Sequence, residues 1–143
     1  MLPTRSDVRE PSPEVRLLAT ECEDVAWAVD ADSVERIVRR SEWLEAPPLD
    51  VAHTLALRPF AEALERVLMV QGVSGAKALL SQGRLRLIEL LASDVQTVPN
   101  IVYGSCFGPV RSVVLEATDF PVLICDPESL EAALGRRQLR EVR

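Results

Sequence analysis

Residues 110–130, VRSVVLEATDFPVLICDPESL, carry the pattern on which the fold prediction depends. Two short apolar runs, Val110–Leu115 and Phe120–Cys125, flank the polar turn EATD, which predicts a β-hairpin. In the DPES stretch that follows, aspartate stands directly before proline, an arrangement typical of a helix start. A terminal helix over Ser129–Leu139 is therefore predicted, with Leu130 facing inwards.

Asp126 ends an apolar strand, a position where many enzymes hold a catalytic acid. A structural role explains it as well, because aspartate before Pro127 accepts a hydrogen bond from the amide of Glu128 or Ser129. Glu128 also complements the helix dipole in the first turn. No second acid or base stands at a spacing that would make it a catalytic partner of Asp126, so the sequence favours the role of a helix cap.

Two more hairpins are predicted upstream of this stretch. Val15–Thr20 and Val25–Val29 surround the acidic turn ECED. Arg66–Gln71 and Ala76–Leu80 surround Gly72–Gly75, whose glycines suit a tight turn. Short strands with frequent turns predict a mostly β domain, a barrel or sandwich, since a parallel sheet would need a crossover helix between successive strands.

The stretch that follows the first hairpin has a helix-like pattern. Asp32–Glu35 resembles a capping box, in which the aspartate side chain caps and the glutamate reaches back. A helix or turn is expected next, with Val34, Ile37 and Val38 on one side. Pro47 and Pro48 end this segment.

Four other segments have less decisive patterns. Leu49–Leu57 suits a strand or a short helix, and Phe60–Leu64 suits one helical turn. Arg84–Leu91 alternates at first and then becomes continuously apolar, so both strand and helix are open. Pro99–Gly108 reads as a loop with strand character.

Composition excludes several classes of function. The chain has 143 residues and a formal net charge of -6, which argues against nucleic acid as the main partner. No apolar run is long enough to span a bilayer, so no membrane insertion is expected. Residues 1–14 are expected to be a disordered lead, and residues 15–143 a single domain. Three widely spaced cysteines fit a reducing cytoplasm.

Chemistry-bearing motifs are scarce. His53 is the only histidine, which excludes a histidine-based metal cluster, and the cysteines form no metal framework. A dyad of Cys106 and His53 is conceivable, but nothing local supports it. No glycine-rich phosphate loop is present. The sequence predicts no cofactor, no metal and no enzymatic activity.

Two stretches together resemble the CheW-like domain. The first is residues 25–48, VAWAVDADSVERIVRRSEWLEAPP, and the second is residues 66–100 followed by residues 110–130. The resemblance rests on the order and spacing of several short motifs and covers most of residues 15–134. The chain lacks the family's strand pair around a Gly-x-x-Asn-x-Arg-Gly motif, and Leu49-Asp50-Val51 resembles the remnant of its Asp-Leu end.

This resemblance implies two small, intertwined SH3-like β-barrels with an apolar groove between them and a C-terminal helix. It also implies a bacterial chemotaxis adaptor that couples the cytoplasmic tip of a chemoreceptor to the regulatory domain of a CheA-type histidine kinase, in a pathway that controls motility. The missing hairpin changes the exposed sheet edges, which calls docking to the kinase into question and suggests specialisation to one partner.

The resemblance also assigns candidate partner-binding residues. Six apolar residues match segments that line the family's groove, although an ordinary core would explain the same pattern: Val34, Ile37, Val38, Ala78, Leu79 and Leu80. An alternative resemblance is to roadblock-type regulators of small GTPases, on residues 66–85, where a helix would run into the glycine turn. A strand over residues 66–71 would favour the adaptor, and a helix end the roadblock fold. A third hypothesis is an enzyme that uses Cys106 or Asp126.

Overall fold

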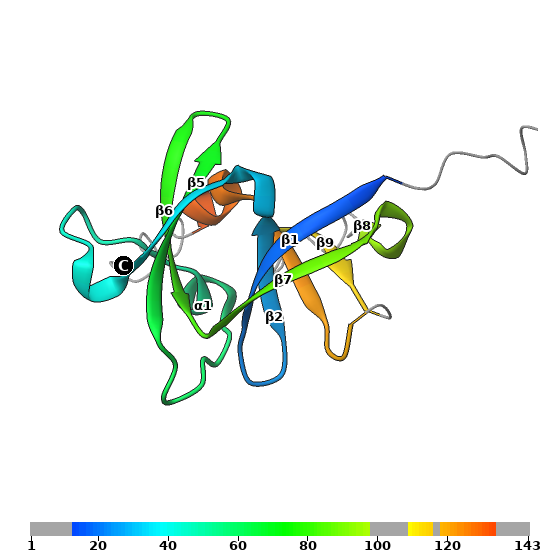
Figure 1. Cartoon of the computed structure of the whole chain (residues 1–143), viewed down its shortest axis with the longest axis horizontal. Helices are drawn as coiled ribbons and strands as arrows, with labels where there is room; N and C mark the ends of the chain where they lie inside the picture. Colours follow the sequence, from blue (N-terminus) through cyan, green and yellow to red (C-terminus); the bar gives the residue numbers. More distant parts are fainter. Residues whose placement is uncertain (1–12, 98–108, 116–117, 134–143) are drawn as a thin grey trace, which may run out of the picture.

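The computed structural model describes residues 13–97, 109–115 and 118–133, and these form two β-sheets with few helices. Figure 1 shows two lobes, one built by each sheet. The chain begins in the larger sheet, builds the smaller one and then returns to the larger. The sequence-based prediction of a mostly β fold with two intertwined barrels is confirmed.

The large sheet has six strands in the order β7-β1-β2-β10-β9-β8. The strand bounds are β1 (Glu14–Glu21), β2 (Ala26–Asp30), β7 (Arg84–Leu91), β8 (Gln96–Thr97), β9 (Val110–Val114) and β10 (Val122–Cys125). Antiparallel pairing of β1 with β2 and of β9 with β10 confirms the first and third predicted hairpins. The pair β2 and β10 is parallel, with Ala26 opposite Val122.

The small sheet has four strands in the order β3-β5-β6-β4. Its strands are β3 (Val34–Arg39), β4 (Leu49–Asp50), β5 (Glu65–Gly72) and β6 (Gly75–Gln82). The β5–β6 hairpin closes through the two-residue turn Val73-Ser74, and Gly75 has a φ of 125°, which favours glycine. The second predicted hairpin is therefore confirmed.

Strand β2 contributes side chains to both hydrophobic core clusters. Trp27 and Val29 point into a core cluster between the sheets, while Ala26 and Ala28 point into a second cluster inside the large sheet. Successive strand residues face opposite sides, so a strand buried on both faces reads as a continuous apolar run. This is why AWAV contains no polar residue.

Each core cluster draws on several strands. The cluster between the sheets includes Leu68, Val70 and Leu79 of the small sheet, and Leu123 and Leu130 from the end of the chain. The cluster inside the large sheet comprises Leu17, Ala19, Ala26, Ala28, Leu90, Val114 and Val122. Because β7, β1, β2, β10 and β9 all contribute to the second cluster, the large sheet curls around it as a small barrel.

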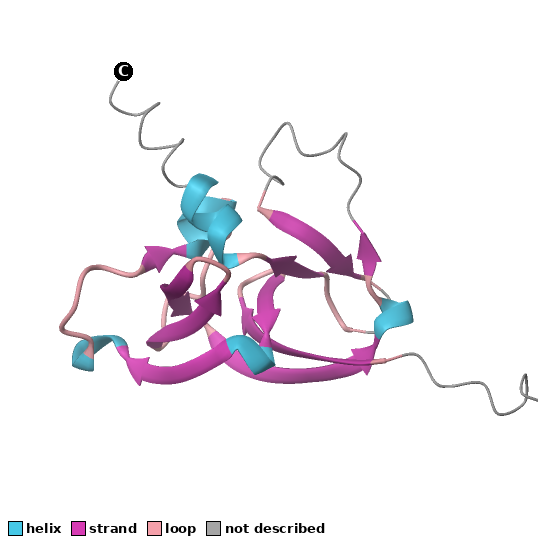
Figure 2. Ribbon diagram, turned by 90° about the horizontal axis from the view of Figure 1, so that it is seen from above, coloured by secondary structure: helices cyan, strands magenta, loops and turns pink. Residues whose placement is uncertain are grey.

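Residues 127–133 form a helix that leaves β10 and packs against the small sheet. It is viewed from above in Figure 2. Asp126 caps the helix by accepting hydrogen bonds from the Ser129 amide at 3.1 Å and the Ser129 hydroxyl at 3.0 Å. The predicted cap is confirmed. Leu130 is 1% exposed, as its inward orientation requires, whereas the rest of the predicted helix, 134–139, lies outside the described residues.

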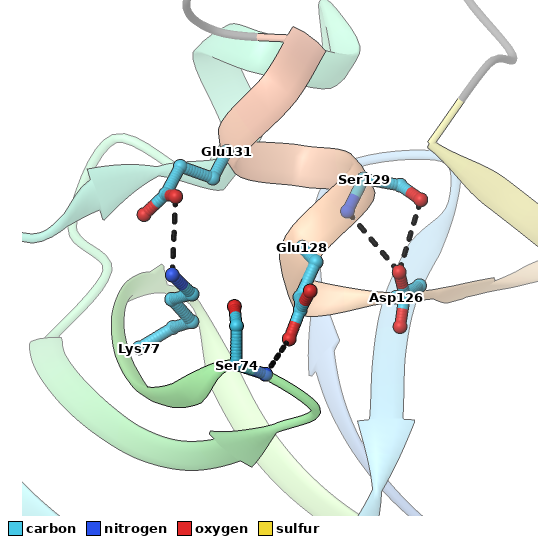
Figure 3. A network of polar contacts seen from close by, with 6 residues as sticks. All are labelled: Ser74, Lys77, Asp126, Glu128, Ser129 and Glu131. Carbon is cyan, nitrogen blue, oxygen red and sulfur yellow. Dashed lines mark hydrogen bonds and ion pairs between the residues drawn. The ribbon is translucent and has the colours of Figure 1, made fainter.

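The helix is fastened to the tip of the β5–β6 hairpin by polar contacts, drawn in Figure 3. The Glu128 carboxylate accepts a hydrogen bond from the Ser74 amide, and Lys77 Nζ lies 3.1 Å from Glu131 Oε1. Gly72 makes the first contact possible, because a Cβ there would lie 2.9 Å from Glu128 Oε1. The helix thus connects a strand of the large sheet to a hairpin of the small one.

One segment departs from the prediction. A helix or turn was expected after Asp32, with Asp32 as its cap. The structure instead has a single 3-10 turn, η1 (Ala31–Ser33), capped by Asp30, and then strand β3. A register shift between Val34 and Arg36 marks a bulge in β3. This bulge places Val34 opposite Val70 and Ile37 opposite Leu68, so a three-residue spacing that imitates a helix arises in a strand.

For the remaining segments, the structure decides between the secondary structures that the sequence leaves open. Leu49–Leu57 contains both predicted forms, since β4 leads into α1 (Val51–Leu55). Phe60–Leu64 is a turn rather than a helical turn, with the Ala63 amide 3.1 Å from the Phe60 carbonyl. Arg84–Leu91 is strand β7. Two short 3-10 turns, η2 (Arg40–Glu42) and η3 (Ala92–Asp94), complete the described elements.

Two predictions fall outside what the structure describes. The predicted loop over Pro99–Gly108 lies there entirely, and so does the predicted lead over residues 1–14 except for its last two residues, of which Glu14 begins β1. The roadblock alternative is wrong. It required residues 66–71 to be the end of a helix, and they lie within strand β5.

Candidate functional site

A groove of about 670 Å³ lies between the two sheets and is a candidate binding site. Its walls come from β1, β2 and β10 of the large sheet and from the tip of the β5–β6 hairpin of the small sheet. A cleft between two packed units is a common location for binding. The apolar residues among those that line it are Val15, Leu17, Val29, Val70, Val73, Ala92, Val95 and Ile124.

The floor of the groove is rigid, because its residues belong to the core. Leu17, Val29 and Val70 are 2%, 1% and 0% exposed. Val73 differs from them, since its side chain is 97% exposed at the hairpin tip. The Glu128–Ser74 contact holds this tip in place, so Val73 is presented on a fixed turn.

The rim of the groove is charged. Arg16 Nη1 lies 3.3 Å from Asp32 Oδ1, and Arg111 Nη1 lies 3.8 Å from Asp126 Oδ1. The Arg16, Asp32 and Arg111 side chains are 47%, 71% and 70% exposed, so both ion pairs are largely open to solvent and contribute little stability.

The candidate chemical groups that the structure describes have structural surroundings. Within them, no group of three histidine, cysteine, aspartate or glutamate side chains is placed to hold a metal ion. Burial raises the pKa of Cys22 to about 11 and, as the main cause, that of Cys125 to about 12, so both thiols stay protonated and unreactive near neutral pH. Asp126 is engaged as the helix cap. The dyad of Cys106 with His53 is untested, because Cys106 lies outside the described residues.

The six predicted partner-binding residues lie on β3 and β6 of the small sheet. None of them is among the residues that line the groove. Leu79 and Leu80 are 0% and 9% exposed, whereas Ile37 is 46% exposed. Val34, Val38 and Ala78 are half-buried. Strand β5 lies between β3 and β6, so the two sets flank one strand of the same sheet.

Sequence reasoning did not identify the groove residues. The sequence pattern around Val73 indicates only a turn, and the pattern at Asp32 indicates only a helix cap. The one local signal for Val73 is an apolar residue in a two-residue turn, where polar residues are usual. Arg16 and Arg111 carry no local signal, since each is an ordinary exposed strand residue.

Comparison with known proteins identifies the fold. No protein-family model matches the sequence, and no curated protein matches it. Among solved structures, the chain is similar to the scaffolding protein TtCheW from Thermoanaerobacter tengcongensis, with a TM-score of 0.62 and 11% sequence identity. The match covers 82% of this chain and 87% of that one. The CheW-like fold is therefore shown. Separately, none of the helices in the described ranges is long and apolar enough to cross a membrane.

Proposed function

We propose that this chain, which has the fold of a CheW-type scaffolding protein, is a non-catalytic chemosensory adaptor. It couples a chemoreceptor to a CheA-type histidine kinase in the cytoplasm, in a pathway that controls motility. The observation that carries the proposal is the groove between the sheets, with a rigid apolar floor, a charged rim and one exposed apolar residue on a fixed hairpin tip.

The groove suits a helical partner such as a receptor tip. An amphipathic helix presents apolar side chains at regular intervals, and these would pack against the partly exposed lining residues Val15, Val95 and Ile124 while its polar residues meet the rim. Val73 would contact the helix first, because its side chain is almost fully exposed. Full burial of one valine contributes roughly 1.5–3 kcal/mol, which corresponds to about tenfold or more in affinity.

We propose that the six residues on β3 and β6 serve the same function by different routes. Ile37 is exposed and contacts a partner directly. Leu79 and Leu80 are buried and act by keeping the small sheet in shape. An Ile37→Ser substitution that leaves the binding of both partners unchanged would remove Ile37 from the site.

A calorimetric titration tests the proposal. The full chain is titrated with a chemoreceptor cytoplasmic tip and, separately, with the regulatory domain of the kinase from the same organism. Val73→Lys should weaken tip binding by about tenfold or more, since it removes apolar burial and introduces a charge. Leu44→Lys is the matched control, because Leu44 is 92% exposed and does not line the groove.

Each result has a distinct reading. Binding to both partners would make the chain an ordinary coupling protein, whereas binding to one alone would make it a specialised one. Equal effects of the two lysine substitutions would refute the assignment of the groove. Binding to neither partner by a folded sample would refute the adaptor function.

A further inference from the structure

A second, smaller groove of about 350 Å³ lies where β6 passes into β7. Its lining residues are Phe60, Glu62, Ala63, Leu64, Arg66, Gly83 and Arg84. Phe60 and Leu64 are 47% and 53% exposed and line the same groove, so they present apolar surface together. This groove shares no lining residue with the one between the sheets, so it is a separate surface.

Three arginines lie in or beside this groove, since Arg66 and Arg84 line it and Arg39 is the strand partner of Arg66. Arg66 lies directly opposite Arg39 in the antiparallel pairing of β5 with β3. Directly opposed like charges destabilise a strand pair. Within the described residues, no ion pair joins Arg39 or Arg66 to a carboxylate. Arg84 is 84% exposed, and its Nε lies 3.9 Å from Glu21 Oε1, a loose contact.

In the structure, the nearby residues Glu62 and Glu65 form no ion pair with Arg39 or Arg66. Glu62 lines the groove but makes no ion pair with Arg66 in the structure, and Glu65 accepts a hydrogen bond from Gln82 at 3.0 Å. The chain as a whole has a net charge of -6, whereas two arginines and one glutamate line this groove. Arginine binds carboxylates through paired hydrogen bonds and is common at protein interfaces.

We propose that this groove binds an acidic peptide segment of another protein that carries a large apolar side chain. The apolar side chain packs between Phe60 and Leu64, and carboxylates of the segment pair with Arg39, Arg66 and Arg84. A carboxylate between Arg39 and Arg66 also relieves their mutual repulsion. This surface goes beyond the receptor and kinase coupling proposed above and does not depend on it.

Selection of random short peptides displayed on phage, against the immobilised full chain, tests the proposal. Enriched peptides are expected to combine several aspartates or glutamates with leucine, phenylalanine or another large apolar residue. Enrichment of neutral or basic peptides, or no enrichment at all, would overturn the proposal. Binding of the chain to vesicles of anionic lipid through the same arginines would overturn it too, because a membrane would then be the ligand.

Charge-reversal variants locate the site. For an enriched peptide synthesised with blocked ends, Arg66→Glu should weaken binding by about tenfold or more, and added salt should weaken wild-type binding. Arg111→Glu is the matched control, because Arg111 lies on the rim of the other groove and should leave peptide binding unchanged. Equal losses in both variants would overturn the assignment. Circular dichroism and thermal unfolding of Arg66→Glu verify folding, and Phe60→Ser provides a second variant without a charge change.

These variants also separate the two proposals. Val73→Lys changes only the groove between the sheets and should leave peptide binding intact. Conversely, Arg66→Glu should leave the binding of a receptor tip intact. Failure of either proposal would thus be seen without affecting the test of the other.

Discussion

Gly83 is the residue at which the small sheet passes back into the large one, and it has no room for a side chain. A Cβ there would lie 2.2 Å from the Glu21 carbonyl oxygen, 3.1 Å from the Glu21 carbonyl carbon and 2.9 Å from Thr20 Cγ2. An ordinary contact begins near 3.4 Å, so Gly83→Ala requires a displacement of more than an ångström. The obstructing atoms are largely backbone of β1, which is paired on both sides by β2 and β7.

The cost of Gly83→Ala follows from three contributions. Overpacking of this kind typically costs about 1–3 kcal/mol. Displacement of β6 from β1 also stretches the buried Thr20–Ser81 hydrogen bond of 2.8 Å, whose loss costs roughly 1 kcal/mol. Alanine recovers about 0.5–1 kcal/mol by restricting the unfolded chain. We therefore expect the free energy of unfolding to fall by about 2 kcal/mol, and the melting temperature by roughly 5 °C.

Urea unfolding followed by tryptophan fluorescence measures this change, because Trp27 and Trp43 are both buried. Gly72→Ala is the matched control. Its nearest obstruction is Glu128 Oε1 at 2.9 Å, the end of a flexible side chain that can move aside at the cost of its exposed hydrogen bond with the Ser74 amide. The Gly75 carbonyl oxygen at 3.1 Å would have to shift by only a few tenths of an ångström. We expect it to cost less than half as much as Gly83→Ala. If Gly83→Ala is as stable as the wild type, or Gly72→Ala is equally destabilised, the reasoning from backbone contact is refuted.

Two further predictions concern stability. Asp126→Ala removes the cap bonds to Ser129 and should lower the free energy of unfolding by about 1 kcal/mol in urea titrations, whereas an unchanged midpoint would show that the cap is dispensable. Burial raises the folded-state pKa of Cys22 to about 11 and that of Cys125 to about 12, from an ordinary value of 9.0. As the pH rises above about 9, these thiols therefore ionise in the unfolded chain while they stay protonated in the folded one. Stability should therefore fall as pH rises above about 9, by roughly 1 kcal/mol per thiol for the next pH unit, and the Cys22→Ala/Cys125→Ala double variant should have a flatter profile.

The strands and the cap were predictable because their signals are local. The turn residues at Gly72–Gly75 and the Asp126-Pro127 pair each determine their structure within a few positions. The misassignment of β3 has an equally physical cause. The bulge between Val34 and Arg36 makes apolar residues recur after three positions, and periodicity alone cannot distinguish this from a helix.

The family resemblance implies a groove between the barrels, but local patterns could not identify the residues that line either groove, because each groove is built from separate segments of the chain. Leu17, Val70 and Ile124 meet at the floor of the larger groove, although they come from different thirds of the chain. The opposed pair Arg39 and Arg66 likewise depends on the register of β3 against β5. Sequence spacing carries no information on such register when the strands are not joined by a hairpin.

The position of β10 in the large sheet has a consequence for synthesis on the ribosome. Strand β2 emerges early, but its neighbour on one side is β10, with Ala26 paired to Val122. While the whole small sheet is being translated, strand β2 of the β1–β2 hairpin has an unpaired, apolar edge. Pairing of segments so distant in the chain is slow, and an open strand edge is prone to aggregation. We therefore expect nascent chains that stop before β10 to need a chaperone, and the groove between the sheets to form only after that strand has been added.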